Sequence, residues 1–416
     1  MKEPGIAKQY YLNHIGDIYN TWRSYRGKGI TIAVIDKGFN PNHEDFTYAD
    51  GSSKVSAKSA SFTTNSSQTT VSVGVDQVVN MGDSHGSFCA GVAAAGLNGK
   101  GVVGIAPEAE LMLLKTDGKP RSIAKAFRYA ADEGAKVITI SIGSYYDYTG
   151  DLVDDGSDLG TVFDEPVRYC VNKGVAVISA GGNGGLDHMP TEYTFPGCVD
   201  NVIGVGGLAA NSSSEIWSGS SYNSSPQYQS IDVFAPADMM YGCCHYDGKK
   251  YDGGWNGTSF ASPIVAGMAA LYFEANPNKT VAQFEQDLYA SCHKITSSSI
   301  ATASQLGYGR VDVGALLETN IKGNVTAKVN ADWASCNAYL WNSVSGASKS
   351  AWPGTSLTKT GEAFTITIDA SQYDSLIFNN GTAKTLDLCA SAFADGATLN
   401  LKNAASELGC VVGTYQ

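Results

Sequence analysis

The feature that most constrains the fold is the alternation of short apolar runs with helix-like segments. The runs are rich in Val, Ile and Leu, as in strands that are buried on both faces. The residue directly after two of the helix-like segments is glycine, which is a usual helix end. The alternation predicts an α/β fold, a doubly wound, mostly parallel sheet with helices on both faces. The runs lie at 29–36, 111–115, 137–142, 175–180, 202–205 and 231–235, and the helices at 85–96, 122–133, 162–173 and 259–274.

The composition changes near residue 320. From Gly323 onward the chain has few helix signals and is rich in Thr, Ser and Asn, and residues 365–368 alternate strictly between Thr and Ile. A chain of 416 residues is also too long for a single hydrophobic core. We therefore expect two domains, an α/β domain over residues 1–322 and a β-sandwich over residues 323–416.

The net charge of −12 excludes some partners. Binding to nucleic acid or to an anionic membrane surface needs clustered Lys and Arg, so we expect neither. We also expect no membrane span, because there is no apolar run of the required length. The first residues lack the apolar core of a signal peptide, which leaves two alternatives, a cytosolic protein or the mature form of a secreted one.

The nine cysteines form no C-x-x-C pair and have no zinc-site spacing. Cys89 and Cys170 lie in helix-like segments, and we interpret them as small buried apolar residues. The adjacent pair at 243–244 lies in a turn-like stretch. It could be redox-labile, but we expect these two cysteines to be plain loop residues. The last quarter of the chain allows one disulfide among Cys336, Cys389 and Cys410.

Three short segments carry residues for nucleophilic catalysis. Asp36 ends an expected strand, His85 begins an expected helix, and Ser259 begins another. A serine hydroxyl needs a base to remove its proton, histidine is such a base, and a buried carboxylate fixes the imidazole tautomer. Each segment alone has an ordinary interpretation as a cap, turn or helix start. All three together, each at the end of an element, indicate a catalytic triad.

These segments resemble those of the subtilisin-like serine proteases, or subtilases. That family carries Asp-Ser/Thr-Gly, His-Gly-Thr and Gly-Thr-Ser-Met-Ala-x-Pro motifs, and this sequence departs from them at Lys37, Ser87 and Phe260. Lys37 is the largest departure, because its charge next to Asp36 is expected to alter the pH dependence. Segments at 104–107, 231–236 and 308–312 are also similar. The resemblance spans about residues 5–320 and implies a serine endopeptidase.

The resemblance also implies an oxyanion hole and a substrate-binding edge. Residues 179–184 resemble the family's Ala-Ala-Gly-Asn segment, so Asn183 would donate to the oxyanion together with the Ser259 N–H. Thr194 would lie near the floor of the primary pocket and narrow it. Substrate would bind as an extended strand. Its two walls would be Ser141, Ile142 and Gly143 on one side and Ala180, Gly181 and Gly182 on the other.

Two further sites follow from resemblance. A structural Ca²⁺ site would use Gln9, Asp45 and the loop around Asn98, since calcium prefers oxygen ligands; the alternative is a calcium-free loop. Residues 325–390 resemble starch-binding carbohydrate modules found beside bacterial amylases. The candidate sugar-stacking residues there are Tyr339, Trp341 and Trp352. One alternative is that these aromatic residues belong to the domain core, as we expect for Phe378. The other is that the domain serves only as a spacer.

We expect a secreted serine endopeptidase that acts on proteins or peptides, with a C-terminal domain for starch-like polysaccharides. Residues 3–16 resemble the start of a mature domain, which favours secretion over a cytosolic location. An esterase of the α/β-hydrolase type is disfavoured, because its triad runs Ser, Asp, His. The other alternative is a catalytically inactive pseudoprotease that acts as a carbohydrate- or protein-binding surface protein, which labelling of Ser259 would distinguish.

Overall fold

The computed structural model describes residues 3–66, 68–147, 159–185, 192–210, 212, 214–223, 229–295, 303–407 and 409–416. The chain forms two compact units. The α/β unit consists of Tyr25–Asn98 and Val102–Val311, and the sandwich unit of Met1–Ser24, Gly99–Gly101 and Asp312–Gln416. The sandwich unit thus includes the first 24 residues as well as the C-terminal strands. The domain boundary at 322/323 that composition indicates stays a prediction.

The α/β unit contains a nine-stranded sheet in the order β13-β10-β9-β7-β5-β1-β4-β2-β3. Neighbouring strands are parallel except for the antiparallel edge pair β2–β3. The mostly parallel sheet predicted from the alternation is confirmed. The strands are β1 (Thr31–Asp36), β2 (Ala60–Asn65), β3 (Gln68–Val73), β4 (Glu110–Thr116), β5 (Val137–Ile140), β7 (Ala176–Ala180), β9 (Val202–Leu208), β10 (Val233–Pro236) and β13 (Gly309–Arg310).

Two two-stranded antiparallel sheets lie outside this sheet. Strand β6 (Ser144–Asp147) pairs with β8 (Glu192–Phe195), and β11 (Met240–Cys243) pairs with β12 (Tyr251–Trp255). Besides the helices that cover the sheet, the described part of the unit contains η3 (Val75–Val78), η4 (Tyr246–Gly248), α6 (Val281–Ser291) and η5 (Ala303–Leu306).

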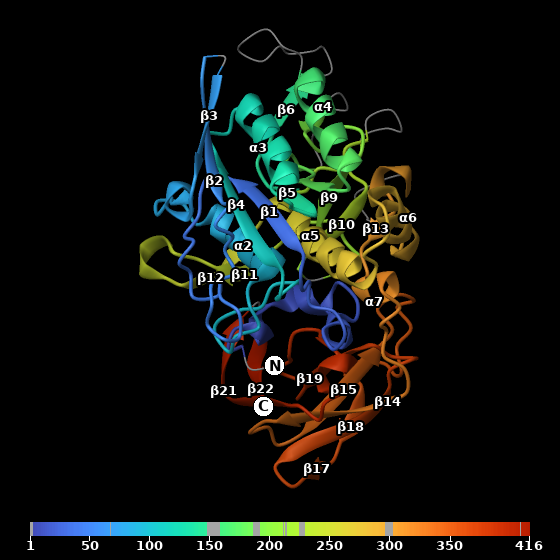
Figure 1. Cartoon of the computed structure of the whole chain (residues 1–416). Helices are drawn as coiled ribbons and strands as arrows, with labels where there is room; N and C mark the ends of the chain where they lie inside the picture. Colours follow the sequence, from blue (N-terminus) through green and yellow to red (C-terminus); the bar gives the residue numbers. More distant parts are fainter. Residues whose placement is uncertain are drawn as a thin grey trace. The chain divides into compact units, whose positions relative to one another are not determined.

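Helices cover both faces of the sheet (Figure 1). Helices α2 (His85–Ala94) and α5 (Thr258–Ala275) pack together on one face, and α3 (Pro120–Asp132) and α4 (Leu159–Asn172) pack together on the other. Ala33 and Ile35 of β1 belong to the core under α3 and α4. Since successive side chains of a strand point to opposite faces, Asp36 points to the α2 and α5 face.

The sandwich unit contains a five-stranded sheet, β17-β18-β14-β21-β22, and a four-stranded sheet, β16-β15-β19-β20. All neighbouring pairs are antiparallel except β14–β21. Every second residue of β14 and β15 is buried, as the predicted sandwich requires. The strands are β14 (Asn324–Asn330), β15 (Cys336–Trp341), β16 (Thr355–Leu357), β17 (Lys359–Thr360), β18 (Ala363–Asp369), β19 (Ser375–Asn379), β20 (Leu388–Cys389), β21 (Thr398–Glu407) and β22 (Cys410–Tyr415).

The N-terminal segment is hydrogen-bonded into the sandwich unit. Asn13 accepts from the Cys389 N–H at 3.2 Å, and Asp17 accepts from the Ile321 N–H at 2.7 Å. The Asn20 side chain donates to the Thr319 carbonyl at 2.5 Å. The helical elements of this unit are η1 (Ile6–Lys8), η2 (Tyr10–Asn13), α1 (Ile18–Thr21), α7 (Val313–Leu316) and η6 (Ala390–Phe393).

The cysteines are all described, and all nine have free thiols. The disulfide that the sequence allowed in the last quarter is therefore not formed. The pair at 243–244 was expected in a loop, but Cys243 ends strand β11 and both side chains are buried. Cys89 and Cys170 are buried as expected. Within the described ranges, no helix combines the length and apolar character needed to cross a bilayer.

Candidate active site

The candidate site lies where several parallel strands end. From β1 the sheet continues to β4 on one side and to β5 on the other, so β1 lies at a switch point of the kind where ligands bind in α/β sheets. A cleft of about 630 Å³ opens there. It is lined by residues that follow strands and by residues at helix starts, among them Asp36, His85, Ser141, Asn183, Thr258 and Ser259.

Asp36 and His85 form the ionic part of the site. The His85 Nδ1 lies 2.9 and 3.0 Å from the two carboxylate oxygens, and Asp36 is only 1% exposed. The Lys37 N–H donates to Asp36 Oδ1 at 2.8 Å. At Gly86 a Cβ would stand 2.3 Å from the Gly38 carbonyl oxygen, so only glycine lets α2 approach this closely. The glycine of the His-Gly motif thus helps His85 to reach Asp36.

The surroundings of His85 favour its charged form. Burial of the imidazole opposes protonation, but the neighbouring Cys89 and Asp36 side chains more than offset this and raise the pKa of His85 well above its usual value. Burial also raises the pKa of the Cys89 thiol.

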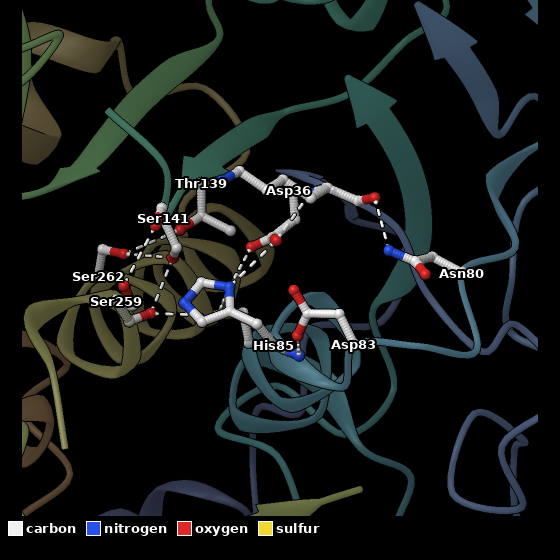
Figure 2. A network of polar contacts seen from close by, with 10 residues as sticks. Asp36, Asn80, Asp83, His85, Thr139, Ser141, Ser259 and Ser262 are labelled. Atoms are coloured by element: carbon white, nitrogen blue, oxygen red, sulfur yellow. Dashed lines mark hydrogen bonds and ion pairs between the residues drawn. The ribbon is translucent and has the colours of Figure 1, made fainter. Parts of the chain in front are cut away.

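Ser259 lies in the first turn of α5, next to the Asp36–His85 pair. Figure 2 shows the second ring nitrogen of His85 on the side of Ser259, while Nδ1 faces Asp36. The Ser259 hydroxyl itself donates to the Ser141 carbonyl at 3.1 Å. Catalytic hydrogen bonds are often completed only when substrate is present, so this orientation of the hydroxyl is compatible with Ser259 as a nucleophile.

The backbone of Ser259 is held by an unusual set of donors. Pro263 has no N–H, so it cannot make the helical hydrogen bond to the Ser259 carbonyl four residues earlier. Instead the Ser141 hydroxyl donates to that carbonyl at 2.8 Å and the Cys89 thiol at 3.3 Å. The proline of the Gly-Thr-Ser-x-Ala-x-Pro motif thus leaves an acceptor that connects α5 to β5 and α2.

Cys89 was interpreted only as a buried small residue, and its place in the site was missed. Its sulfur lies 4.0 Å from His85 Nδ1. The signal was present in the sequence, because residues four apart lie on the same face of a helix.

Asn183 follows β7 and is oriented by Thr258. The Thr258 N–H and hydroxyl both donate to Asn183 Oδ1 at 2.9 Å. Since these two donors need an acceptor, the oxygen of the amide faces Thr258 and the NH₂ group faces the other way. Asn183 also lines the cleft, so its amide can serve as a donor there.

Most of the residues that were expected to bind substrate line the cleft. Ser141, Ile142 and Gly143 line the cleft, as do Ala180 and Gly182. Gly181 is not among the described residues that line the cleft. Its N–H donates to the Val205 carbonyl at 2.8 Å. Thr194 pairs with Tyr145 in the two-stranded β6–β8 sheet, but its side chain lies outside the described part. The cleft also includes residues that sequence reasoning did not select, Asp83, Asp117, Gly118 and Trp255.

Of the predicted calcium ligands, Asp45 fits a cation best. It is fully buried, Oδ2 accepts from the Val102 N–H at 2.9 Å, and Oδ1 makes no hydrogen bond in the described part of the chain. Burial raises the pKa of Asp45 to about 6. Asn98 directs its amide nitrogen to the Thr47 hydroxyl at 3.1 Å. Gln9 belongs to the sandwich unit, where its side chain donates to the Tyr11 hydroxyl at 2.5 Å.

The three candidate sugar-binding residues form one aromatic group in the sandwich unit. Tyr339 and Trp341 alternate along β15 with buried residues, and their rings are stacked with centroids 5.6 Å apart. Trp352 lies edge-on to Tyr339, also at 5.6 Å, and is 51% exposed. Phe378 is fully buried, as expected.

A parallel α/β sheet that places a buried Asp–His pair and a helix-start serine in one cleft defines a subtilisin-like serine endopeptidase. Residues 27–312 match the subtilase family, and residues 325–389 match starch-binding module 26. Thermitase from Thermoactinomyces vulgaris is 30% identical over 297 residues, which cover 70% of this chain and 89% of thermitase.

Two further proteins illustrate the relationship. Subtilisin E from Bacillus subtilis (strain 168) is 31% identical over 298 residues, which cover 70% of this chain and 67% of that protein. The structure of a protease from Pseudoalteromonas arctica superposes with a TM-score of 0.59 at 21% identity, covering 76% of this chain and 98% of that chain, a likeness in fold alone. The chain therefore belongs to the subtilase family.

Proposed function

We propose that Asp36, His85 and Ser259 form the catalytic triad of an endopeptidase that acts outside the cell. The observation that carries the proposal is the imidazole of His85, whose Nδ1 is 2.9 Å from the buried Asp36 carboxylate while its other nitrogen faces Ser259. This is the arrangement that activates a serine hydroxyl. The secretion of the enzyme is inferred from its resemblance to subtilases and its sugar module.

In this mechanism the Ser259 oxygen attacks the carbonyl carbon of the scissile peptide bond, and His85 takes the hydroxyl proton. Asp36 holds the imidazole in the tautomer with hydrogen on Nδ1 and stabilises the imidazolium. His85 then gives its proton to the leaving amine, and an acyl-enzyme remains on Ser259. Water, deprotonated by His85, hydrolyses that ester and releases the second product.

The oxyanion of each tetrahedral intermediate would be stabilised by the Asn183 amide and the Ser259 N–H. The second donor is available because the first N–H groups of a helix have no partner within the helix. The substrate would pair as a strand with Ser141–Gly143. Its primary side chain would lie against Ala180–Gly182, with Thr194 narrowing the pocket.

The accessory functions are proposed on separate grounds. The match to starch-binding module 26 indicates carbohydrate binding, and the proposed contact is stacking of starch-like glycans on Tyr339, Trp341 and Trp352, since sugar C–H faces are apolar. A structural calcium ion would be bound by Asp45, whose buried Oδ1 lacks a hydrogen bond within the described ranges, with Asn98 as a further proposed ligand.

The test is labelling by a fluorophosphonate combined with hydrolysis of an unfolded protein such as casein. We expect the label on Ser259 and hydrolysis by the wild-type chain, and neither in Ser259→Ala, while both proteins keep the same circular dichroism spectrum. A wild-type chain that neither labels nor hydrolyses casein would support the pseudoprotease alternative instead. A label found on another serine would contradict the assignment of the nucleophile.

A further inference from the structure

Lys37 contributes a positive charge to the wall of the cleft. Its side chain is exposed, and it lines the same cleft as Asp36, His85 and Ser259. Among the described residues that line the cleft, Lys37 and His85 are the basic ones.

The backbone of Lys37 is fixed, whereas its ammonium group is available. The N–H donates to Asp36 at 2.8 Å, and the carbonyl accepts from the Asn80 side chain at 3.2 Å. The Lys37 Cε lies 3.7 Å from the point where a Cβ would stand at Gly118, so the aliphatic stem runs beside that glycine. In the described part of the chain, Nζ has no hydrogen bond and no ion pair.

The two acidic side chains that line the cleft besides Asp36 are already engaged by backbone donors. Asp83 accepts from the His85 N–H at 2.9 Å. Asp117 accepts from the Thr64 N–H at 2.7 Å and from the Lys119 N–H at 3.2 Å. These hydrogen bonds hold both carboxylates in place, and neither forms an ion pair with Lys37. An incoming carboxylate can therefore pair with the Lys37 ammonium group without first breaking an ion pair.

Substrate geometry indicates which side chain would reach Lys37. Successive side chains of an extended strand point to opposite sides. In the proposed complex, the residue whose carbonyl is attacked directs its side chain to Ala180 and Gly182. The side chain of the preceding residue then points to the other side. In the order β7-β5-β1-β4, Ala180 ends β7 on one side of β5, while Lys37 follows β1 and Gly118 follows β4 on the other side. Both Lys37 and Gly118 line the cleft.

We propose that Lys37 makes the endopeptidase prefer an acidic residue immediately before the residue whose carbonyl is attacked. This inference rests on the proposed function, because it requires peptide cleavage in this cleft. An ion pair at an exposed site is worth at most about 1 kcal/mol, which corresponds to about two- to fivefold in kcat/KM. The preference should weaken at high ionic strength, since salt screens exposed charges.

The test uses peptides that differ only at this position, with Glu, Gln or Lys, in the best-cleaved sequence from a peptide library. For the wild-type chain we expect kcat/KM to be about two- to fivefold higher for Glu than for Gln, and lowest for Lys. In Lys37→Gln the Glu/Gln ratio should fall to about one, and in Lys37→Glu it should invert. The matched control is Lys28→Gln, an exposed lysine away from the cleft, which should keep the wild-type ratio.

Fluorophosphonate labelling of each variant shows that its active site is formed. Equal rates for Glu and Gln in a wild-type chain that cleaves peptides would overturn the inference and leave the proposed function intact. A preference for Lys, which would assign the subsite to Asp83 and Asp117, would overturn it as well. Failure of the wild-type chain to label or to cleave any peptide would instead reject the proposed function.

Discussion

Replacement of Asn183 by Asp tests the proposed oxyanion hole with little change in shape. The two donors of Thr258 can still bind the retained oxygen, at the 2.9 Å seen for Asn183 Oδ1. The NH₂ group, however, becomes a carboxylate oxygen, which cannot donate. Loss of one oxyanion donor costs about 10²–10³-fold in kcat, or ~2.7–4 kcal/mol, a magnitude taken from a subtilisin, which is a relative of this chain. Repulsion between the carboxylate and the oxyanion should add to this loss.

The assay is steady-state hydrolysis of a chromogenic peptide. Because the donor acts on charge that develops in the transition state, kcat should fall while KM stays nearly constant. Asn183→Ala should lose a similar factor in kcat and, in addition, stability, because two Thr258 hydrogen bonds worth about 1 kcal/mol each are removed. The reasoning is refuted if Asn183→Asp retains kcat within about threefold, or if only KM changes.

Four further results are expected. Because unprotonated His85 is the base and its pKa is raised, kcat/KM should increase with pH and reach a plateau only at alkaline pH, and Asp36→Asn should move this rise to lower pH. Trp352→Ala should weaken retention on insoluble starch by about tenfold, or ~1.4 kcal/mol. Gly16→Ala should lower the melting temperature of the sandwich unit, because φ is +86° and a Cβ would stand 2.1 Å from the Asp312 carboxylate. Chelation of calcium should lower the melting temperature of the wild-type chain but not of Asp45→Asn.

Each result has a control and a contrary outcome. A plateau already at pH 6 would contradict the pH prediction. Tyr246→Ala, an exposed aromatic of the α/β unit, should bind starch like the wild type, and equal binding by Trp352→Ala would remove stacking at this residue. Gly323→Ala has a similar φ of +88° but open space around it, so an equal loss there would mean that backbone strain, and not the clash, explains Gly16→Ala. Insensitivity to chelation would reject the calcium site.

The part of the fold that positions the site could be predicted from short-range patterns. The apolar run before Asp36 and the small-residue helices after His85 and Ser259 gave the positions of β1, α2 and α5. Helix α6 was missed, although its start carries a capping box, in which Thr280 and Gln283 bond to each other's N–H groups. Strands β2 and β3 were missed because an edge pair rich in Thr and Ser has no continuous apolar run.

Other features could not be read from the sequence, because they depend on groups far apart along the chain. The direction of the Ser259 hydroxyl is set by the Ser141 carbonyl, which directly follows strand β5. The burial of Cys243 depends on a hairpin that packs on α2. Composition likewise cannot show that residues near Asp17 bond to residues near Ile321, since that contact spans 304 positions.

The position of the first 24 residues in the sandwich unit has a consequence for an enzyme that digests extended polypeptides. Besides the short crossing at Gly99–Gly101, the chain passes between the two units at residues 24/25 and at 311/312, and beyond both boundaries it belongs to the sandwich unit. The segments beyond these two boundaries are hydrogen-bonded to each other, because the Asn20 side chain donates to the Thr319 carbonyl. Apart from Gly99–Gly101, the α/β unit is thus inserted in the sequence between two parts of the sandwich unit. At 24/25 and at 311/312 the chain therefore continues into a folded segment, which another copy of the enzyme could not draw into its cleft as an extended strand. Self-digestion would have to begin elsewhere, or wait until the sandwich unit unfolds.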